Sequence, residues 1–396
     1  MTLTAAVPRP ELKAAALLRL ACAYAVATNG TILMPLIVGM LMRRFGIGEG
    51  AATGFAGLEI LGIAISCALL PHVVARAPRR AAWIATIGTL LAQAAGAVLP
   101  GIVAVGASRG VAGLFEGVLF AVVAASLSNR AAGERAWGVI ILVGGIVDGA
   151  LLVGAACLPH AADQWLFPLF AAVFALIALP TARAALHAVD AQTGAPPVRR
   201  ASAVRWGTLV PIWIVMILVY GVLAGQWAIA DVNGQRIGLP TAQSGLLLSL
   251  ASVVGLAGCL AASHRRSHAL RVPIIRAAQF TMAAAVVWFF AASGGAGFFL
   301  SQLLVTLAFY AITPFLTARL SELDADGSLV ARSIVITFTS VAIGTALAGT
   351  LLAEAGALGC GIALGVCALA SMPFVRKAFD ARDHAAPIAA PTHQPS

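Results

Sequence analysis

The spacing of the charged residues constrains this chain most, because it leaves long stretches without any charge. Residues 277–318 contain no Asp, Glu, Lys or Arg over 42 positions, and residues 81–108, 206–230 and 237–263 also contain none of these residues. A bilayer core about 30 Å thick is crossed by roughly 20 apolar helical residues, so the longest stretch is long enough for two crossings. The turn sequence Ser-Gly-Gly-Ala-Gly at 293–297 marks the break between them. The chain is therefore predicted to cross a membrane several times.

Composition excludes a water-soluble protein and a membrane β-barrel. Hydrophobic residues make up 61% and charged residues 10% of the 396 positions, whereas soluble domains carry about 25% charge. The apolar stretches are too long for barrel strands of about ten residues, and helices satisfy their own backbone hydrogen bonds in lipid. We predict an all-α membrane protein with twelve transmembrane helices in two pseudo-symmetric six-helix bundles, at 17–42, 50–74, 81–100, 101–126, 137–158, 165–185, 208–230, 241–263, 273–293, 297–319, 333–355 and 358–376.

The net charge of +10 follows membrane topology and does not indicate a nucleic-acid partner. With twelve crossings, 21 basic residues fall at one side of the membrane and only Arg43, Arg44 and Arg236 at the other. Cytoplasmic loops carry the excess of Lys and Arg, so both termini are predicted to be cytoplasmic. We expect the bacterial inner membrane.

The one long polar connection, residues 187–205, divides the chain into predicted bundles at 1–186 and 206–379. It is expected to be a central cytoplasmic loop, and the Ala-, Pro- and His-containing tail at 380–396 is expected to be disordered. The six cysteines lie in or at the ends of predicted helices without a CxxC pair, so no metal or redox site and no cofactor is expected.

Three short motifs make the chain similar to the major facilitator superfamily. Residues 71–80 keep the three basic positions of that family's loop motif, Arg76, Arg79 and Arg80, but not its Asp or its two glycines. Arg109, with glycines four and eight residues later, resembles its fourth-helix motif, and Gly145-xxx-Gly149 resembles its fifth-helix motif with Ala in place of Pro. The resemblance covers the whole chain and implies a monomeric bacterial permease that moves a small molecule by alternating access. It also implies that the basic loop contributes to gating.

Four charged residues lie within predicted helices: Glu59, Arg109, Glu116 and Asp148. A charge at the bilayer centre costs at least about 2.5–3.5 kcal/mol, so each needs a partner or a function. Glu59 and Arg109 fall at similar depth in the second and fourth predicted helices, which run the same way, so an ion pair between them is reasonable. Glu116 follows Arg109 by seven residues and returns to nearly the same helix face.

Two interpretations of these charges remain open. They neutralise one another and clamp the N-terminal bundle, or they line a central cavity where at least one carboxylate carries protons. One arginine cannot neutralise three carboxylates, and an unpaired buried carboxyl favours its protonated form. Glu116 is the first candidate for the proton carrier and Asp148 the second.

Polar residues on other helices are candidates for the substrate cavity. Asn29, Gln226 and Trp227 occupy helices that line the cavity in the family that the chain resembles, although Trp227 is equally consistent with an interfacial belt. Gln93 and Gln302 are expected to join helices by hydrogen bonds rather than to bind a ligand.

The sequence favours a transporter over an enzyme. It has no nucleophile–base pair, no metal cluster and no GxxxxGK[ST] motif for ATP. A cavity with one cation and up to three acids fits proton-coupled efflux of a neutral or cationic amphipathic compound. The alternatives are proton-coupled uptake of a small organic acid, with Arg109 binding its carboxylate, and a facilitator without proton coupling.

Overall fold

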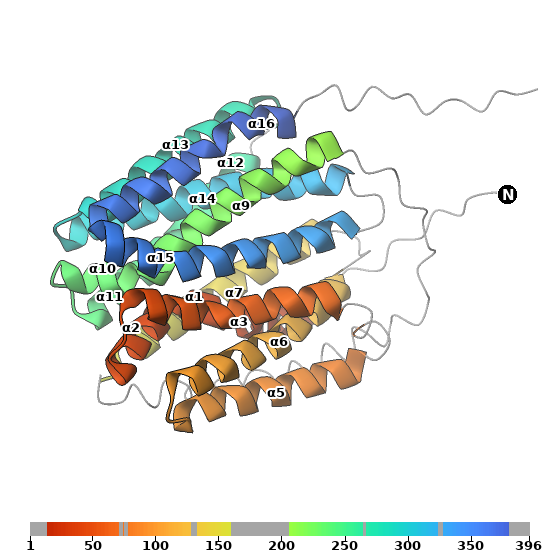
Figure 1. Cartoon of the computed structure of the whole chain (residues 1–396). Coiled ribbons are helices and arrows are strands. Elements are labelled where there is room, and N and C mark those ends of the chain that lie inside the picture. Colours follow the sequence, from red (N-terminus) through yellow and green to blue (C-terminus); the bar gives the residue numbers. More distant parts are fainter. Residues whose placement is uncertain are drawn as a thin grey trace, which may run out of the picture.

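The computed structural model of the chain describes residues 14–70, 74, 78–127, 133–159, 206–263, 267–323 and 328–379. All regular structure in these ranges is helical (Figure 1). The predicted sixth helix at 165–185, the central loop at 187–205 and the tail at 380–396 lie outside the described residues, and so does Arg76.

The helices fall into two groups along the chain (Figure 1). The N-terminal group consists of α1 (Ala14–Ile32), α2 (Met34–Phe45), α3 (Glu49–Leu69), α5 (Pro78–Val98), α6 (Ile102–Leu127) and α7 (Gly133–Ala156). The C-terminal group consists of α9 (Trp206–Ala228), α10 (Ala230–Arg236), α11 (Thr241–Gly255), η2 (Leu256–Cys259), α12 (Leu260–Ser263), α13 (Ser267–Ala291), α14 (Gly295–Leu323), α15 (Ser328–Ala370) and α16 (Met372–Ala378).

Ten described helices are long and apolar enough to cross a membrane. One of them contains two crossings, because Gly356 takes a φ of 69° and ψ of 178° inside α15 and separates it into two helical parts. The two parts appear as separate rods that meet at the left of Figure 1. Each predicted crossing except the sixth therefore has a helix at its position in the described structure.

The prediction of one continuous first helix at 17–42 is wrong, because the chain breaks at Leu33 between α1 and α2. Pro35 has no N–H and cannot continue the hydrogen-bond ladder, and the amide of Leu36 turns to the carbonyl oxygen of Leu33 at 3.0 Å. The seventh helix breaks at a similar place, where α9 ends at Ala228 and α10 begins at Ala230.

The two groups meet along two pairs of helices, α3 with α15 and α7 with α11. Figure 1 shows α15 lying along α3 at the boundary between the groups. Small residues allow this close approach. A Cβ on Gly57 would lie 3.3 Å from the carbonyl oxygen of Ala342, and Ser249 donates its hydroxyl to the carbonyl oxygen of Gly149 at 3.0 Å.

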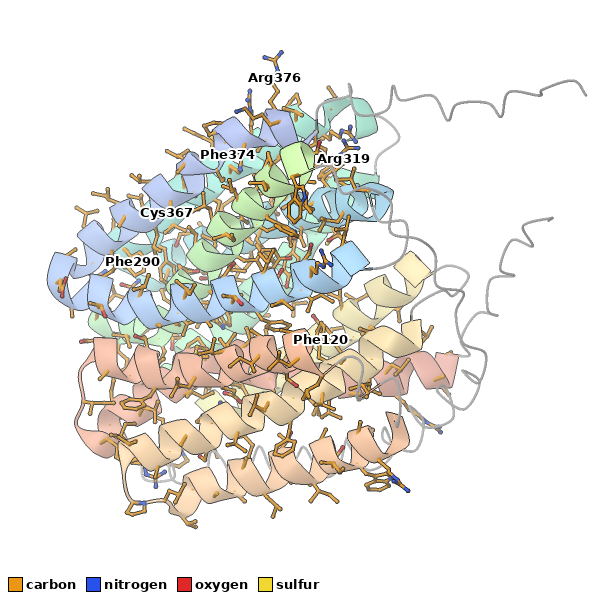
Figure 2. The ribbon with its side chains drawn as sticks, turned by 45° about the vertical axis from the view of Figure 1, so that its right-hand side comes forward. Phe120, Phe290, Arg319, Cys367, Phe374 and Arg376 are labelled. Carbon is orange, nitrogen blue, oxygen red and sulfur yellow. The ribbon has the colours of Figure 1, made fainter. Side chains whose placement is uncertain are left out.

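The two ends of the bundle differ in their contacts. At one end, which we call the α2–α10 end, α2 packs against both α9 and α10. The opposite end, at which α9 and α15 begin, we call the α9 end. Arg319 and Arg376 both lie at the α9 end (Figure 2), where Arg319 is buried and donates its Nε–H to the carbonyl oxygen of Ala378 at 3.2 Å.

Glycines bring α6 unusually close to α3 inside the N-terminal group. A Cβ on Gly113 would collide with the carbonyl oxygen of Glu59, and one on Gly117 would lie 2.7 Å from the carbonyl oxygen of Ile63. The backbones of these helices are therefore in close contact at both glycines. This contact fixes the distance between the acidic residue of α3 and the charged residues of α6.

Candidate functional site

The ion pair expected between Glu59 and Arg109 is present. It joins α3 to α6, and both side chains are almost completely buried. Arg109 also donates from Nη1 to the side-chain oxygen of Gln93 on α5 at 2.6 Å. A buried guanidinium that faces a carboxylate and an amide oxygen has both charge compensation and hydrogen bonds, which a stable buried ion requires.

Gln93 connects both acidic residues to the arginine. Its amide nitrogen donates to Glu59 at 3.1 Å and to Glu116 at 3.2 Å, while its amide oxygen accepts from Arg109. Glu59, Gln93, Arg109 and Glu116 therefore form one buried group, which we call the Arg109 network. Its second acid is incompletely satisfied, because Oε2 of Glu116 has no hydrogen-bond partner among the described residues.

The Arg109 network lies inside the N-terminal group of helices. The carboxyl group of Glu59 occupies the space that a Cβ on Gly30 of α1 would need. The network is thus enclosed by α1, α3, α5 and α6, and it contains one cation and two acids. Such an arrangement can hold one exchangeable proton on a carboxylate without any change in its basic residue.

Asp148, the fourth predicted charge, lies apart from the Arg109 network. It is buried on α7 and accepts a hydrogen bond from the Thr28 hydroxyl of α1 at 3.4 Å through Oδ2. Its other oxygen, Oδ1, has no partner among the described residues. The structure therefore brings together three of the four predicted charges and leaves Asp148 with a neutral partner.

The three tyrosines of the chain interact electrostatically with one another, and two of them, Tyr24 and Tyr310, also interact with Asp148. Tyr24 of α1 is within electrostatic range of Asp148, of Tyr220 on α9 and of Tyr310 on α14. Tyr310 is likewise within range of Asp148 and Tyr220. These residues come from both helix groups. We call this set of four residues the Asp148 cluster.

The predicted cavity residues take up different roles in the packing. Gln226 is buried and donates to the side chain of Gln302 at 2.6 Å, which joins α9 to α14. Trp227 donates its indole N–H to the carbonyl oxygens of Thr31 and Ile32 at 3.1 and 3.0 Å, across the boundary between the groups. Asn29 is buried on α1.

The basic loop is only partly described. Arg80 is exposed near the start of α5, and Arg79 lies in the first turn of the same helix. No group of three or more His, Cys, Asp or Glu side chains suited to a metal ion occurs in the part of the chain that the structure describes.

Sequence reasoning missed the residues that connect the charges. Gln93 was expected only to join helices, yet it contacts all three charged members of the Arg109 network. The tyrosines carried a usable signal, because the chain has only three and each lies in a predicted helix. Thr28 carried no such signal, because threonines in apolar helices usually bond to the backbone of their own helix. The Thr28 hydroxyl does so as well, since it donates to the carbonyl oxygen of Tyr24 at 2.9 Å.

No protein-family model matches this sequence, and no curated protein does. Solved structures do match. The human organic anion transporter MFSD10 (TETRAN) has a TM-score of 0.62 and 18% identity, over 91% of this chain and 98% of that one. A D-xylose–proton symporter has a TM-score of 0.69 and 14% identity, over 91% and 96%. The chain therefore shares the helical membrane-protein fold of these two transporters over nine tenths of its length.

Proposed function

We propose that this protein is a secondary active transporter that exports a neutral or cationic amphipathic compound in exchange for protons. It works by alternating access, with the bundles at 1–186 and 206–379 moving against each other about a site near the middle of the membrane. The observation that carries the proposal is Oε2 of Glu116, which lies in the buried Arg109 network and has no hydrogen-bond partner among the described residues. Charge distribution supports an orientation with both termini, and hence the α9 end, in the cytoplasm of a bacterial cell.

The charge balance of the Arg109 network supports proton coupling. Arg109 pairs directly with Glu59, while Glu116 receives a hydrogen bond from the neutral amide of Gln93. A second buried carboxylate without its own cation is more stable when protonated. The charge of the network therefore changes when Glu116 gains or loses a proton. Coupling to a proton gradient requires such a change.

The contacts between the helix groups support alternating access. The α3–α15 and α7–α11 contacts are lined by small residues, which let whole helices tilt against one another without displacing large side chains. Breaks at Leu33 and Ile229 separate α2 and α10 from the helices that precede them. Broken helices next to the boundary of two repeats are a common feature of transporters that open to each side in turn.

Uptake of a small organic acid is the alternative, and one of the similar structures is named as an organic anion transporter. An acid bound by Arg109 would have to displace Glu59 from a buried ion pair or enter while Glu59 is protonated. The direct pairing of Arg109 therefore favours the export of neutral or cationic compounds over the uptake of acids.

The test uses inside-out vesicles with a fluorescent proton reporter and a panel of amphipathic cations, neutral aromatics, sugars and organic acids. Wild type is compared with Glu116→Gln, and Glu354→Gln is the matched control because Glu354 is exposed near the α2–α10 end. Proton movement with a cation or neutral compound that is lost in Glu116→Gln and kept in Glu354→Gln supports the proposal. Proton movement with acids alone establishes the uptake alternative. Cargo movement without proton movement establishes a facilitator.

A further inference from the structure

Two buried hydroxyl groups of the N-terminal group, those of Ser66 on α3 and Thr89 on α5, have no hydrogen-bond partner in the part of the chain that the structure describes. Hydroxyls in apolar helices usually donate to a carbonyl one turn earlier in the same helix. Thr86 of α5 follows this rule and donates to the carbonyl oxygen of Ala82 at 2.9 Å. A buried polar group that forgoes this bond is costly unless another ligand satisfies it.

Both hydroxyls belong to the buried region around Glu116. A Cβ on Gly117 would lie 2.6 Å from the Cβ of Ser66, so Ser66 packs against the turn of α6 that carries Glu116. Thr89 lies four residues before Gln93, whose amide donates to Oε1 of Glu116 at 3.2 Å. Residues four apart share a helix face and lie about 6 Å apart along the axis. Oγ of Ser66, Oγ1 of Thr89 and Oε2 of Glu116 are therefore three buried oxygens of one region, each without a partner among the described residues.

This region lies on the side of the Arg109 network that faces the α9 end. Arg44 of α2 donates to the carbonyl oxygens of Gly96 and Ala97 at 2.9 and 3.0 Å, which fixes the last turn of α5 at the α2–α10 end. Because α5 runs from the α9 end to that point, Thr89 lies nearer the α9 end than Gln93 does (Figure 1). The helix α3 runs in the opposite direction, so Ser66 is displaced toward the same end.

Water is the ligand whose hydrogen bonds match these three oxygens. One water molecule donates twice and accepts as well, and buried waters typically make about three hydrogen bonds to polar groups that lack other partners. A metal cation fits less well, because Arg109 already places a positive charge on the same Gln93 that bonds to Glu116. Among the described residues, no group of three or more acidic, His and Cys side chains suited to a metal occurs.

We propose that water molecules bound to Ser66, Thr89 and Glu116 form the route by which the proton of Glu116 leaves toward the α9 end. The O–H bond of the Glu116 carboxyl group breaks as a new O–H bond forms on the adjacent water. Hydrogen-bonded waters and hydroxyls then pass a proton onward, so that a carboxylate remains and one proton is released. This proposal rests on the proposed function, because it gives the path of the proton that Glu116 carries.

The water route is separate from the path of the cargo. The cargo passes between the two helix groups, whereas the three oxygens lie between helices of the N-terminal group alone. The helix α6 packs on both α3 and α5, and its glycines bring its backbone into contact with that of α3. The three helices form one packed unit, so Ser66 and Thr89 keep their places beside Glu116 while the two groups move against each other.

The test follows hydrogen–deuterium exchange at Glu116 by infrared spectroscopy of the full-length protein in lipid at acidic pH. The C=O band of protonated Glu116 is identified by its loss in Glu116→Gln, and the rate of its shift in D₂O measures access by water. We expect Ser66→Ala and Thr89→Val each to slow this exchange at least about tenfold, because each removes a link and raises the barrier to proton transfer. Thr89→Ser keeps a hydroxyl and should exchange as fast as wild type.

Ser301→Ala and Thr337→Val are the matched controls. Both remove a hydroxyl that donates to a carbonyl of its own helix in the C-terminal group, at 2.6 Å for Ser301 and 2.9 Å for Thr337. Neither change should alter the exchange rate of Glu116.

Unchanged exchange in a well-folded Ser66→Ala or Thr89→Val protein would overturn the proposal, and each variant tests the route if the other does not fold. A wild-type spectrum without a band that Glu116→Gln removes would also overturn it, because Glu116 would then hold no proton. Failure of the route and failure of the function are distinguishable. Slowed exchange without proton movement in vesicles leaves the water route standing and removes proton-coupled export. Proton movement with normal exchange in both variants removes the route and leaves the transporter.

Discussion

Trp227 of α9 donates its indole N–H to the carbonyl oxygen of Ile32, at 3.0 Å, across the boundary between the two helix groups. The bond compensates for the break in the first helix. Pro35 has no N–H for the carbonyl of Thr31, and Leu36 bonds to Leu33 instead of Ile32. Trp227 therefore satisfies two acceptors that α1 and α2 leave open, and it does so only while α9 lies against the end of α1.

Replacing Trp227 by Phe should shift the protein toward the conformation that is open at the α2–α10 end. The ring volume is largely kept, but two partly buried carbonyls lose their donor, which costs about 1–3 kcal/mol in the conformation in which α2 contacts α10. Pulsed electron spin resonance between labels at the exposed positions Gly48 and Pro240 reports this opening. We expect a larger population of long distances in the variant.

The control for this experiment is Trp288→Phe, because Trp288 is a partly exposed residue on α13. It removes an indole from the same protein without touching the boundary between the groups. An unchanged distance distribution in Trp227→Phe would mean that the bond does not contribute to closure.

Removal of Arg109 should destabilise the protein more than removal of Arg109 and Glu59 together. Arg109→Leu leaves Glu59 buried without its cation, which costs about 3–5 kcal/mol. Arg109→Leu with Glu59→Leu removes both charges, so thermal unfolding in detergent should recover part of the loss. Additive losses in the double variant would contradict a direct energetic coupling between the two residues.

Transport should separate the two interpretations of this pair. Arg109→Ala is expected to impair export much more than Lys13→Ala at matched expression. If the double variant with both residues replaced by Leu is stable and still exports, the pair is a structural clamp. If it is stable and inactive, the pair takes part in transport.

Gln93→Leu should slow proton-coupled export more than Gln302→Leu does. Both changes remove a buried amide that joins helices. Gln93 contacts the charged residues Glu59, Arg109 and Glu116, whereas Gln302 contacts the neutral Gln226. Initial rates of proton movement in vesicles compare the two variants. Equal rates would place the Arg109 network outside the proton path.

Gly113→Ala should lower the midpoint of thermal unfolding. The added methyl group would meet the carbonyl oxygen of Glu59, so α6 must move away from α3 at a cost of about 1–3 kcal/mol. Gly54→Ala on α3 is the control, because nothing lies within 4 Å of a Cβ there. Alanine at that position should be neutral or slightly stabilising, since it favours the helix by about 0.5–1 kcal/mol.

The helices and one ion pair were predictable because they follow from rules that act along the chain. Uncharged stretches of sufficient length located the membrane helices, and similar depth in two helices that run the same way paired Glu59 with Arg109. Helix breaks were harder to predict than helices. Pro35 is a possible break in the sequence, but many prolines only kink a membrane helix. The break at Leu33 depends on a donor, Trp227, that lies far away in the sequence.

The membership of the buried groups could not be derived from depth alone. Asp148 and Glu116 both fall near mid-membrane, but α7 packs mainly on α1 and α11, while α6 packs on α3 and α5. This neighbour order separates the two acids. Gln93 joined the network for the same reason, because α5 turns it toward the space between α3 and α6.

The close packing of α3 against α15 has a consequence for how the protein is made. Gly349 of α15 contacts the backbone of Glu49 on α3. The ribosome synthesises Glu49 early and Gly349 near the end of the chain. Until α15 is inserted, lipid must cover the face of α3 that later binds it. The early helices must therefore hold together through their own contacts, above all those of α3 with α6. The glycines of α6 that fix the Arg109 network thus also keep the nascent N-terminal group intact while the rest of the chain is synthesised.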